Sequence, residues 1–167
     1  MDYEVKTAKG VVGITFDDDT QVKVGEHSEL IIDDFVYDPT SSSGSLGLLV
    51  TMGTVKYSSG QLAHNNPDSV DIKTPSATIA VRGTAFSMTV NELGDSLIVL
   101  LPNSDGSVGE IMVETDVGQV ILNRAFQLTA TFNRDAAPTP PAIIQLTEDQ
   151  INNLMIVSPP IKSKEDK

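Results

Sequence analysis

The sequence predicts an all-β domain, and three observations support this prediction. Short runs of alternating apolar and polar residues recur about every 8–12 residues up to Phe132. Gly, Asp, Asn and Ser clusters separate these runs, as turns do. Hydrophobic residues make up 40% of the 167-residue chain, which is enough for one domain with a sizeable core. We therefore expect a sandwich or roll of short antiparallel strands over residues 1–134.

The first strands are expected around an acidic turn. Residues 11–16 and 21–24 alternate on either side of Asp17-Asp18-Asp19, which predicts a β-hairpin. Residues 29–32 and 35–37 are the next two expected strands. The Ser-rich residues 41–45 predict a flexible loop.

The later strands show either the same period of two or a continuous apolar run. They are expected at residues 46–56, 77–81, 85–90, 96–101, 109–114, 119–122 and 125–132. Gly53 is expected to form a bulge or turn within the first of them. Residues 64–68 predict a loop, and Val70 and Ile72 open a short strand after it.

The core is expected to hold the inward-facing aliphatic and aromatic side chains of these strands. We predict as core residues Ile14, Phe16, Val22, Val24, Ile31, Val50, Ile79, Val81, Phe86, Ile98, Val99 and Phe126.

The C-terminal part changes in composition. Prolines at 138, 140 and 141 predict a stiff, extended linker over residues 135–146, because proline fixes φ and lacks a donor for strand pairing. An arm at residues 147–167 follows, where Thr147 and Gln150 match a capping box for one short helix. Such a helix is not stable alone and must dock. The helix could dock on a neighbouring subunit or fold back on its own β domain. The side chains expected to make this contact are Ile151, Leu154, Met155 and Ile156.

Composition excludes several functions. The chain has no cysteine, so thiolate zinc sites and cysteine nucleophiles are ruled out. Its formal net charge of −12 disfavours binding to nucleic acid or to an anionic membrane surface. Neither histidine lies in a metal or nucleophile signature, and no phosphate loop is present. We expect a non-enzymatic protein without a cofactor.

The acidic turn at residues 17–19 has two interpretations. Together with Asp33 and Asp34 it could offer oxygen ligands to calcium. It lacks the glycine and the bidentate Glu of an EF-hand loop, so a solvated hairpin tip is favoured.

The most specific segment runs from residue 74 to residue 86. Alternation places Ala77, Ile79 and Val81 on one face of a strand, and Gly83 allows a tight turn after Arg82. The segment resembles the hallmark of the FecR-like domain family, TP-x-A-x-x-x-x-RGT-x-F. The matching residues are Thr74, Pro75, Ala77, Arg82, Gly83, Thr84 and Phe86.

The resemblance extends over residues 5–132 and implies an all-β, non-enzymatic module. In the best-known members this module lies on the periplasmic side of a transmembrane anti-sigma regulator. Here Asp19 replaces the usual turn glycine, and no transmembrane helix or export signal is visible. Arg82 could bind a carboxylate across an interface, although internal pairing at the strand end is favoured.

The sequence is compatible with two functions. The favoured one is a structural assembly protein of a bacteriophage virion, in the capsid, connector or tail, that binds copies of itself and neighbouring subunits as a homo-oligomer. The missing leader, the Pro-rich arm and the helix that needs a dock support it, and the location would be the virion, or else the cytoplasm. The alternative is a FecR-like regulatory or signalling domain that binds a protein partner.

Overall fold

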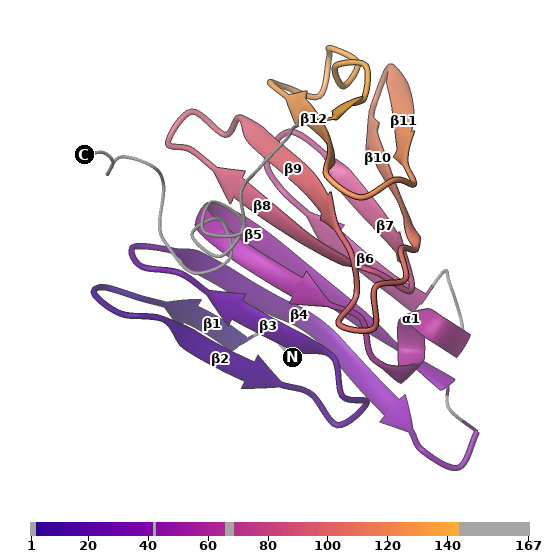
Figure 1. Cartoon of the computed structure of the whole chain (residues 1–167). Helices are drawn as coiled ribbons and strands as arrows, with labels where there is room; N and C mark the ends of the chain where they lie inside the picture. The colour runs from indigo at the N-terminus through magenta and orange to yellow at the C-terminus, as the bar shows by residue number, and fades with distance from the viewer. Residues whose placement is uncertain (1–2, 42, 66–68, 144–167) are drawn as a thin grey trace.

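The computed structural model describes residues 3–41, 43–65 and 69–143 and confirms the all-β fold class. The strands form one strongly curled sheet whose two halves, sheet A and sheet B, share the long strand β5 (Ser43–Ser58). In Figure 1, β5 runs between the N-terminal strands and the C-terminal strands. The curled sheet encloses the core.

Each half continues outward from β5 in both directions. Sheet A has the order β11 (Gly118–Leu122), β10 (Glu110–Thr115), β7 (Thr78–Arg82), β6 (Val70–Lys73), β5, β4 (Glu29–Asp38) and β1 (Tyr3–Lys6). Sheet B has the order β13 (Ala142–Ile143), β12 (Gln127–Thr131), β9 (Ser96–Leu101), β8 (Ala85–Val90), β5, β3 (Gln21–Val24) and β2 (Val12–Thr15). The described pairs are antiparallel except β5 with β6, which is parallel.

Gly53 marks the point where β5 passes from one half to the other. Residues up to Met52 pair with β4, whereas Gly53 to Ser58 pair with β8. Gly53 has a φ of 101°, and a Cβ there would lie 2.1 Å from Ser28 Oγ. Only glycine permits this conformation and this approach, so the expected bulge is a crossing point inside one continuous strand.

Several elements differ from the expectation. The strands expected at 29–32 and 35–37 are one strand, β4, with a register shift between Ile32 and Asp34. Part of the expected 41–45 loop belongs to β5, which begins at Ser43. A short helix, α1 (Gln61–Asn65), occupies the start of the loop expected at 64–68. None of the helices in the described ranges is long and apolar enough to cross a bilayer.

Most of the predicted core is buried. The residues with at most 3% exposure are Val22, Val24, Val50, Ile79, Val81, Phe86, Ile98 and Val99. Ile14, Phe16, Ile31 and Phe126 are half-buried, because they lie on outer strands or on the outer face. The centre of the core contains the rings of Tyr57 and Phe86, whose centroids are 5.3 Å apart.

The chain was expected to leave the β domain at residue 135, but the described residues contact it up to Ile143. Thr139 N donates to the carbonyl of Ala130, and Thr139 Oγ1 accepts from Ala130 N, both at 2.9 Å. Thr129 Oγ1 donates to the carbonyl of Thr139 at 2.7 Å. Thr139, which stands between prolines, thus supplies the backbone donor that proline lacks and two further acceptors, and β13 pairs with β12 directly afterwards. The expected arm at residues 147–167, with Ile151, Leu154, Met155 and Ile156, lies outside the described residues.

Candidate functional site

The first half of the 74–86 motif forms a tight turn between β6 and β7. Thr74 N donates to the carbonyl of Ala77 at 2.9 Å, and Ala77 N donates back to Thr74 Oγ1 at 3.1 Å. Ser76 N also donates to Thr74 Oγ1, at 3.2 Å. Pro75 lies exposed in this turn and not in the strand, which begins at Thr78. The turn is therefore fixed by the Thr74 hydroxyl.

Four buried hydroxyl groups connect this turn to sheet B. Ser76 Oγ lies 3.0 Å from Ser96 Oγ on β9 and 2.7 Å from Thr131 Oγ1 on β12. Ser96 Oγ donates to Thr74 Oγ1 at 2.8 Å. All four residues are at most 2% exposed, so each hydroxyl must find its hydrogen-bond partners within the protein. No local sequence pattern indicates this cluster, because the bonded residues Ser76 and Thr131 lie 55 residues apart.

The second half of the motif is a corner where the chain passes from sheet A to sheet B. Gly83 has a φ of 60°, as its expected role in a tight turn requires. Thr84 N donates to Ser59 Oγ at 3.1 Å, Ser59 Oγ donates to the Thr84 carbonyl at 2.8 Å, and Thr84 Oγ1 donates to the Leu101 carbonyl at 3.2 Å. A Cβ on Gly109 would lie 2.3 Å from the carbonyl oxygen of Arg82. The corner is thus packed from both sides.

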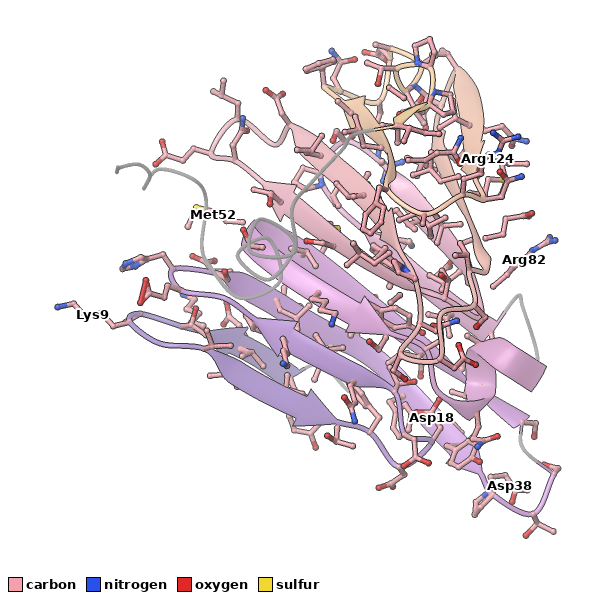
Figure 2. The ribbon with its side chains drawn as sticks, viewed as in Figure 1. Lys9, Asp18, Asp38, Met52, Arg82 and Arg124 are labelled. Carbon is pink, nitrogen blue, oxygen red and sulfur yellow. The ribbon has the colours of Figure 1, made fainter. Side chains whose placement is uncertain are left out.

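The Arg82 side chain lies at the surface, as Figure 2 shows. Its Nη1 lies 3.6 Å from Glu110 Oε2 on the neighbouring strand β10, and the two side chains are 58% and 35% exposed. The structure therefore shows an internal surface ion pair, which contributes little stability. Phe86 at the end of the motif is fully buried. The motif as a whole thus forms the turn and the corner that connect the two halves of the sheet.

The acidic turn is not a uniformly solvated tip. Asp17 and Asp19 are exposed, but Asp18 is fully buried. Asp18 Oδ1 accepts from Thr20 N at 3.0 Å, and Oδ2 accepts from Thr20 Oγ1 at 2.8 Å and from Leu62 N at 3.1 Å. Asp18 therefore anchors the start of α1 to the β2–β3 turn.

The acidic residues do not converge as the calcium interpretation required. Asp33 and Asp34 line a separate pocket on sheet A. No group of three or more His, Cys, Asp or Glu side chains suited to a metal occurs in the described ranges. Asp19 has a φ of 72°, so an aspartate occupies the left-handed position where the family usually has glycine.

The outer face of sheet A is open and carries a shallow pocket of about 230 Å³. Its lining includes Asp33, Asp34, Ser45, Gly47, Asp71 and Lys73. Strand register places Ile121, Met112, Ala80, Asp71 and Gly47 in one row across this face. We call these residues, with Asp33 and Asp34, the sheet A face. It combines the apolar side chains of Ile121, Met112 and Ala80 with the carboxylates of Asp33, Asp34 and Asp71.

Comparisons with known proteins agree with this architecture. A sequence model described as FecR protein matches residues 3–120. Two crystal structures, each named as a "putative anti-sigma factor" from Parabacteroides distasonis, share the fold. The first has a TM-score of 0.59 and 14% identity and covers 83% of this chain; the second has a TM-score of 0.55 and 13% identity and covers 82%. The alignments span 59% and 58% of those chains, so this chain corresponds to about three fifths of their length. No curated protein matches the sequence.

These findings overturn the expectation of a bacteriophage structural protein. The family match and the names of the structural neighbours favour the alternative, a regulatory domain, and nothing in them points to a virion. The resemblance seen in the 74–86 motif is confirmed by a match over most of the chain, and the protein belongs to the FecR family.

Proposed function

We propose that this chain is a non-enzymatic regulatory domain that acts by binding a protein partner in a signalling system of the anti-sigma type. The observation that carries the proposal is the FecR match over residues 3–120, together with a fold shared with a protein named as an anti-sigma factor. Two features of the molecule add independent support.

The first feature is the internal role of the motif. Its hydroxyl groups, on Thr74, Ser76 and Thr84, bond to one another, to neighbouring hydroxyls or to backbone groups. A nucleophilic hydroxyl needs a base within hydrogen-bond reach, and these hydrogen bonds bring no carboxylate or imidazole to the cluster. The motif thus stabilises a scaffold, which supports a binding function over a catalytic one.

The second feature is the sheet A face. Ile121 on the edge strand β11 is 43% exposed and adjoins Met112 and Ala80 in the strand register. Asp33, Asp34 and Asp71 lie further along the same face. A partner surface with an apolar centre and basic flanks would complement it, and the net charge of −12 would speed such an association.

The test uses the purified protein together with purified sigma-factor and receptor proteins from the same organism. Binding is measured by isothermal titration calorimetry. We expect one of these proteins to bind, and Ile121→Asp to weaken that binding at least tenfold, which corresponds to about 1.4 kcal/mol. Leu93→Asp is the matched control, because Leu93 is 84% exposed in the β8–β9 turn and outside the sheet A face; it should leave the Kd within twofold.

The possible outcomes test the regulatory function and the location of the binding site separately. Absence of binding to any of these proteins, with unchanged transcription from the sigma-dependent promoter when the gene is deleted, would refute the regulatory function. Binding that resists Ile121→Asp but is lost with Leu93→Asp would keep the function and move the site away from the sheet A face.

A further inference from the structure

The two N-terminal strands are edges of the sheet, because β1 pairs only with β4 and β2 only with β3 among the described strands. An open edge can pair with another chain, so proteins usually guard it with charged side chains, proline or a bulge. β1 carries Glu4 and Lys6. β2 has none of these guards, and residues 10–16 contain no charged residue. In Figure 1, β2 forms the outer border of the N-terminal strands.

The edges at the other end of the sheet are less open. β13 has two residues, Ala142 and Ile143. β11 begins at Gly118, where a Cβ would lie 2.9 Å from the Ala137 side chain. The strand β2 is therefore the edge best suited to pair with another strand.

Hydrogen-bond alternation fixes which backbone groups of β2 face outward. Phe16 N donates to the Thr20 carbonyl at 2.9 Å, so Phe16 is bonded to the β3 side of the hairpin. Bonded and non-bonded residues alternate along an antiparallel pair, so the other even-numbered residues of β2 are bonded to β3 as well. The odd-numbered residues present their N–H and C=O groups to the open side, where no described strand lies. These residues are Val11, Gly13 and Thr15.

The side chains of β2 alternate between two faces. Val12 and Ile14 lie opposite the buried Val24 and Val22, so they are on the core side of sheet B. Val12 is nevertheless 41% exposed, because no described strand lies beyond it. Gly13 is on the other face, where a Cβ would have nothing within 4 Å. Packing within one chain therefore does not require glycine at this position.

A second copy of β2 fits this edge in an antiparallel register. Outward-facing residues must meet outward-facing residues, so the odd-numbered residues of one copy pair with those of the other. The register that uses all three of them places a two-fold axis at Gly13, with Val11 of each copy opposite Thr15 of the other. Val12 of each copy then lies opposite Ile14 of the other, and this contact covers apolar side chains that the open edge leaves in water.

The charges at the two ends of β2 are complementary in this register. Lys9 precedes the strand and Asp17 follows it, and both are exposed. Figure 2 shows Lys9 and Asp18, the neighbour of Asp17, at opposite ends of this border. The pairing about Gly13 brings Lys9 of each copy towards Asp17 of the other, at both ends of the contact. The net charge of −12 opposes association of two copies elsewhere on the surface, so these end contacts favour this edge.

We propose that two copies of this chain pair through β2, antiparallel and about a two-fold axis at Gly13, so that their B halves form one continuous sheet. The occupant of the edge is a second copy, because β2 is complementary to itself in its backbone groups, its apolar side chains and its end charges. A symmetric pair is the commonest form of homo-oligomer. The pairing is independent of the regulatory function. It leaves β7, β10 and β11 of the sheet A face free, because these strands lie at the far end of sheet A from the N-terminal edge.

Sedimentation velocity of the full chain tests the pairing. We expect the mass to rise from 17.8 kDa towards twice that value as the protein concentration is raised from about 1 μM to about 100 μM. Gly13→Glu places two carboxylates against each other at the axis and should raise the dimer Kd about tenfold or more. One chain should tolerate the change, since the added Cβ has open space, and circular dichroism checks this.

The matched control is Gln119→Glu, which adds the same charge at an exposed position of the other edge strand, β11. It should leave the dimer Kd within about twofold. A monomer at every concentration, or equal effects of Gly13→Glu and Gln119→Glu, would overturn the proposal.

Charge exchange separates the end contacts from the net charge. Lys9→Asp makes each chain more negative and Asp17→Lys makes it less negative, so an effect of net charge alone would weaken the dimer in the first variant and strengthen it in the second. We expect both variants to raise the Kd about threefold or more, because each puts like charges together at both ends. The double variant should return the Kd to within about twofold of its original value. Opposite effects of the two single variants would overturn the register.

Disulfide formation locates the axis, since the chain has no cysteine of its own. Paired residues at hydrogen-bonded positions have Cα atoms about 5.5 Å apart, which a disulfide can span. Gly13→Cys should therefore form a covalent dimer when glutathione disulfide oxidises the two thiols, and a non-reducing gel shows the doubled mass. Thr15→Cys is the control and should stay monomeric on the gel, because its two thiols would lie four residues apart along the strands, or about 14 Å. Cross-linking of Thr15→Cys in preference to Gly13→Cys would overturn the proposal.

Discussion

The acidic turn allows a sharp test, because three adjacent aspartates have different environments. Asp18→Ala removes a fully buried carboxylate that accepts hydrogen bonds from Thr20 N, Thr20 Oγ1 and Leu62 N. The change leaves two buried backbone N–H groups without partners, at about 1–3 kcal/mol each. We therefore expect the free energy of unfolding to fall by about 2–6 kcal/mol. Asp17→Ala, at an exposed position of the same turn, should change it by less than about 0.5 kcal/mol.

The measurement is urea denaturation of both variants, followed by circular dichroism at neutral pH. Asp18→Asn provides a second test. It replaces one carboxylate oxygen by an NH2 group, a donor that would face the Leu62 N–H or the Thr20 hydroxyl. It should cost about 1–3 kcal/mol, less than the alanine substitution. Equal losses for Asp17→Ala and Asp18→Ala would show that the turn is solvated throughout, and the anchoring of α1 by Asp18 would then be wrong.

The remaining predictions concern the core and the motif. Phe86→Ala should cost about 3–5 kcal/mol in the same denaturation assay, since the side chain is fully buried, and a change under about 0.5 kcal/mol would place it on the surface. Gly109→Ala should lower the free energy of unfolding by more than about 1 kcal/mol, because the new Cβ would meet the Arg82 carbonyl. Gly13→Ala, which has open space around it, should leave the free energy of unfolding unchanged. Burial raises the pKa of Tyr57 to about 12, so the folded protein keeps a proton that the unfolded chain loses near pH 10. The free energy of unfolding should therefore fall as the pH rises from about 10 to about 12, and Tyr57→Phe should make this fall smaller. An identical fall in both proteins would contradict the raised pKa of Tyr57.

Local pattern was enough for most of the strands. Residues 85–90 and 96–101 were predicted with the bounds that β8 and β9 have in the structure, because both strands have strong apolar patterns and end at turn residues. The face of β7 was also predictable, since Ile79 and Val81 alternate with half-buried or exposed residues. The 74–86 motif gave the family, which the match over residues 3–120 confirms.

The function was harder to predict than the fold. The virion expectation rested on the N-terminus, the prolines and the C-terminal helix, which report how a chain is arranged and not what it binds. The described part of the Pro-rich segment proved to contact the β domain through Thr139, a contact invisible in the local sequence. Prolines alone therefore did not show whether this segment leaves the domain or lies against it.

What the sequence determined by itself is the set of elements, because strands and turns follow from periods and residue types over a few positions. What only the tertiary structure decided is where polar groups meet. Asp17 and Asp18 are neighbours of the same type, yet one is solvated and the other is buried, because Leu62, 44 residues away, brings its N–H to Asp18. Likewise, Ser76 and Thr131 form a buried pair across 55 residues. Such contacts depend on how the sheet curls, and sheet curvature is a property of the whole chain that no short stretch of sequence encodes.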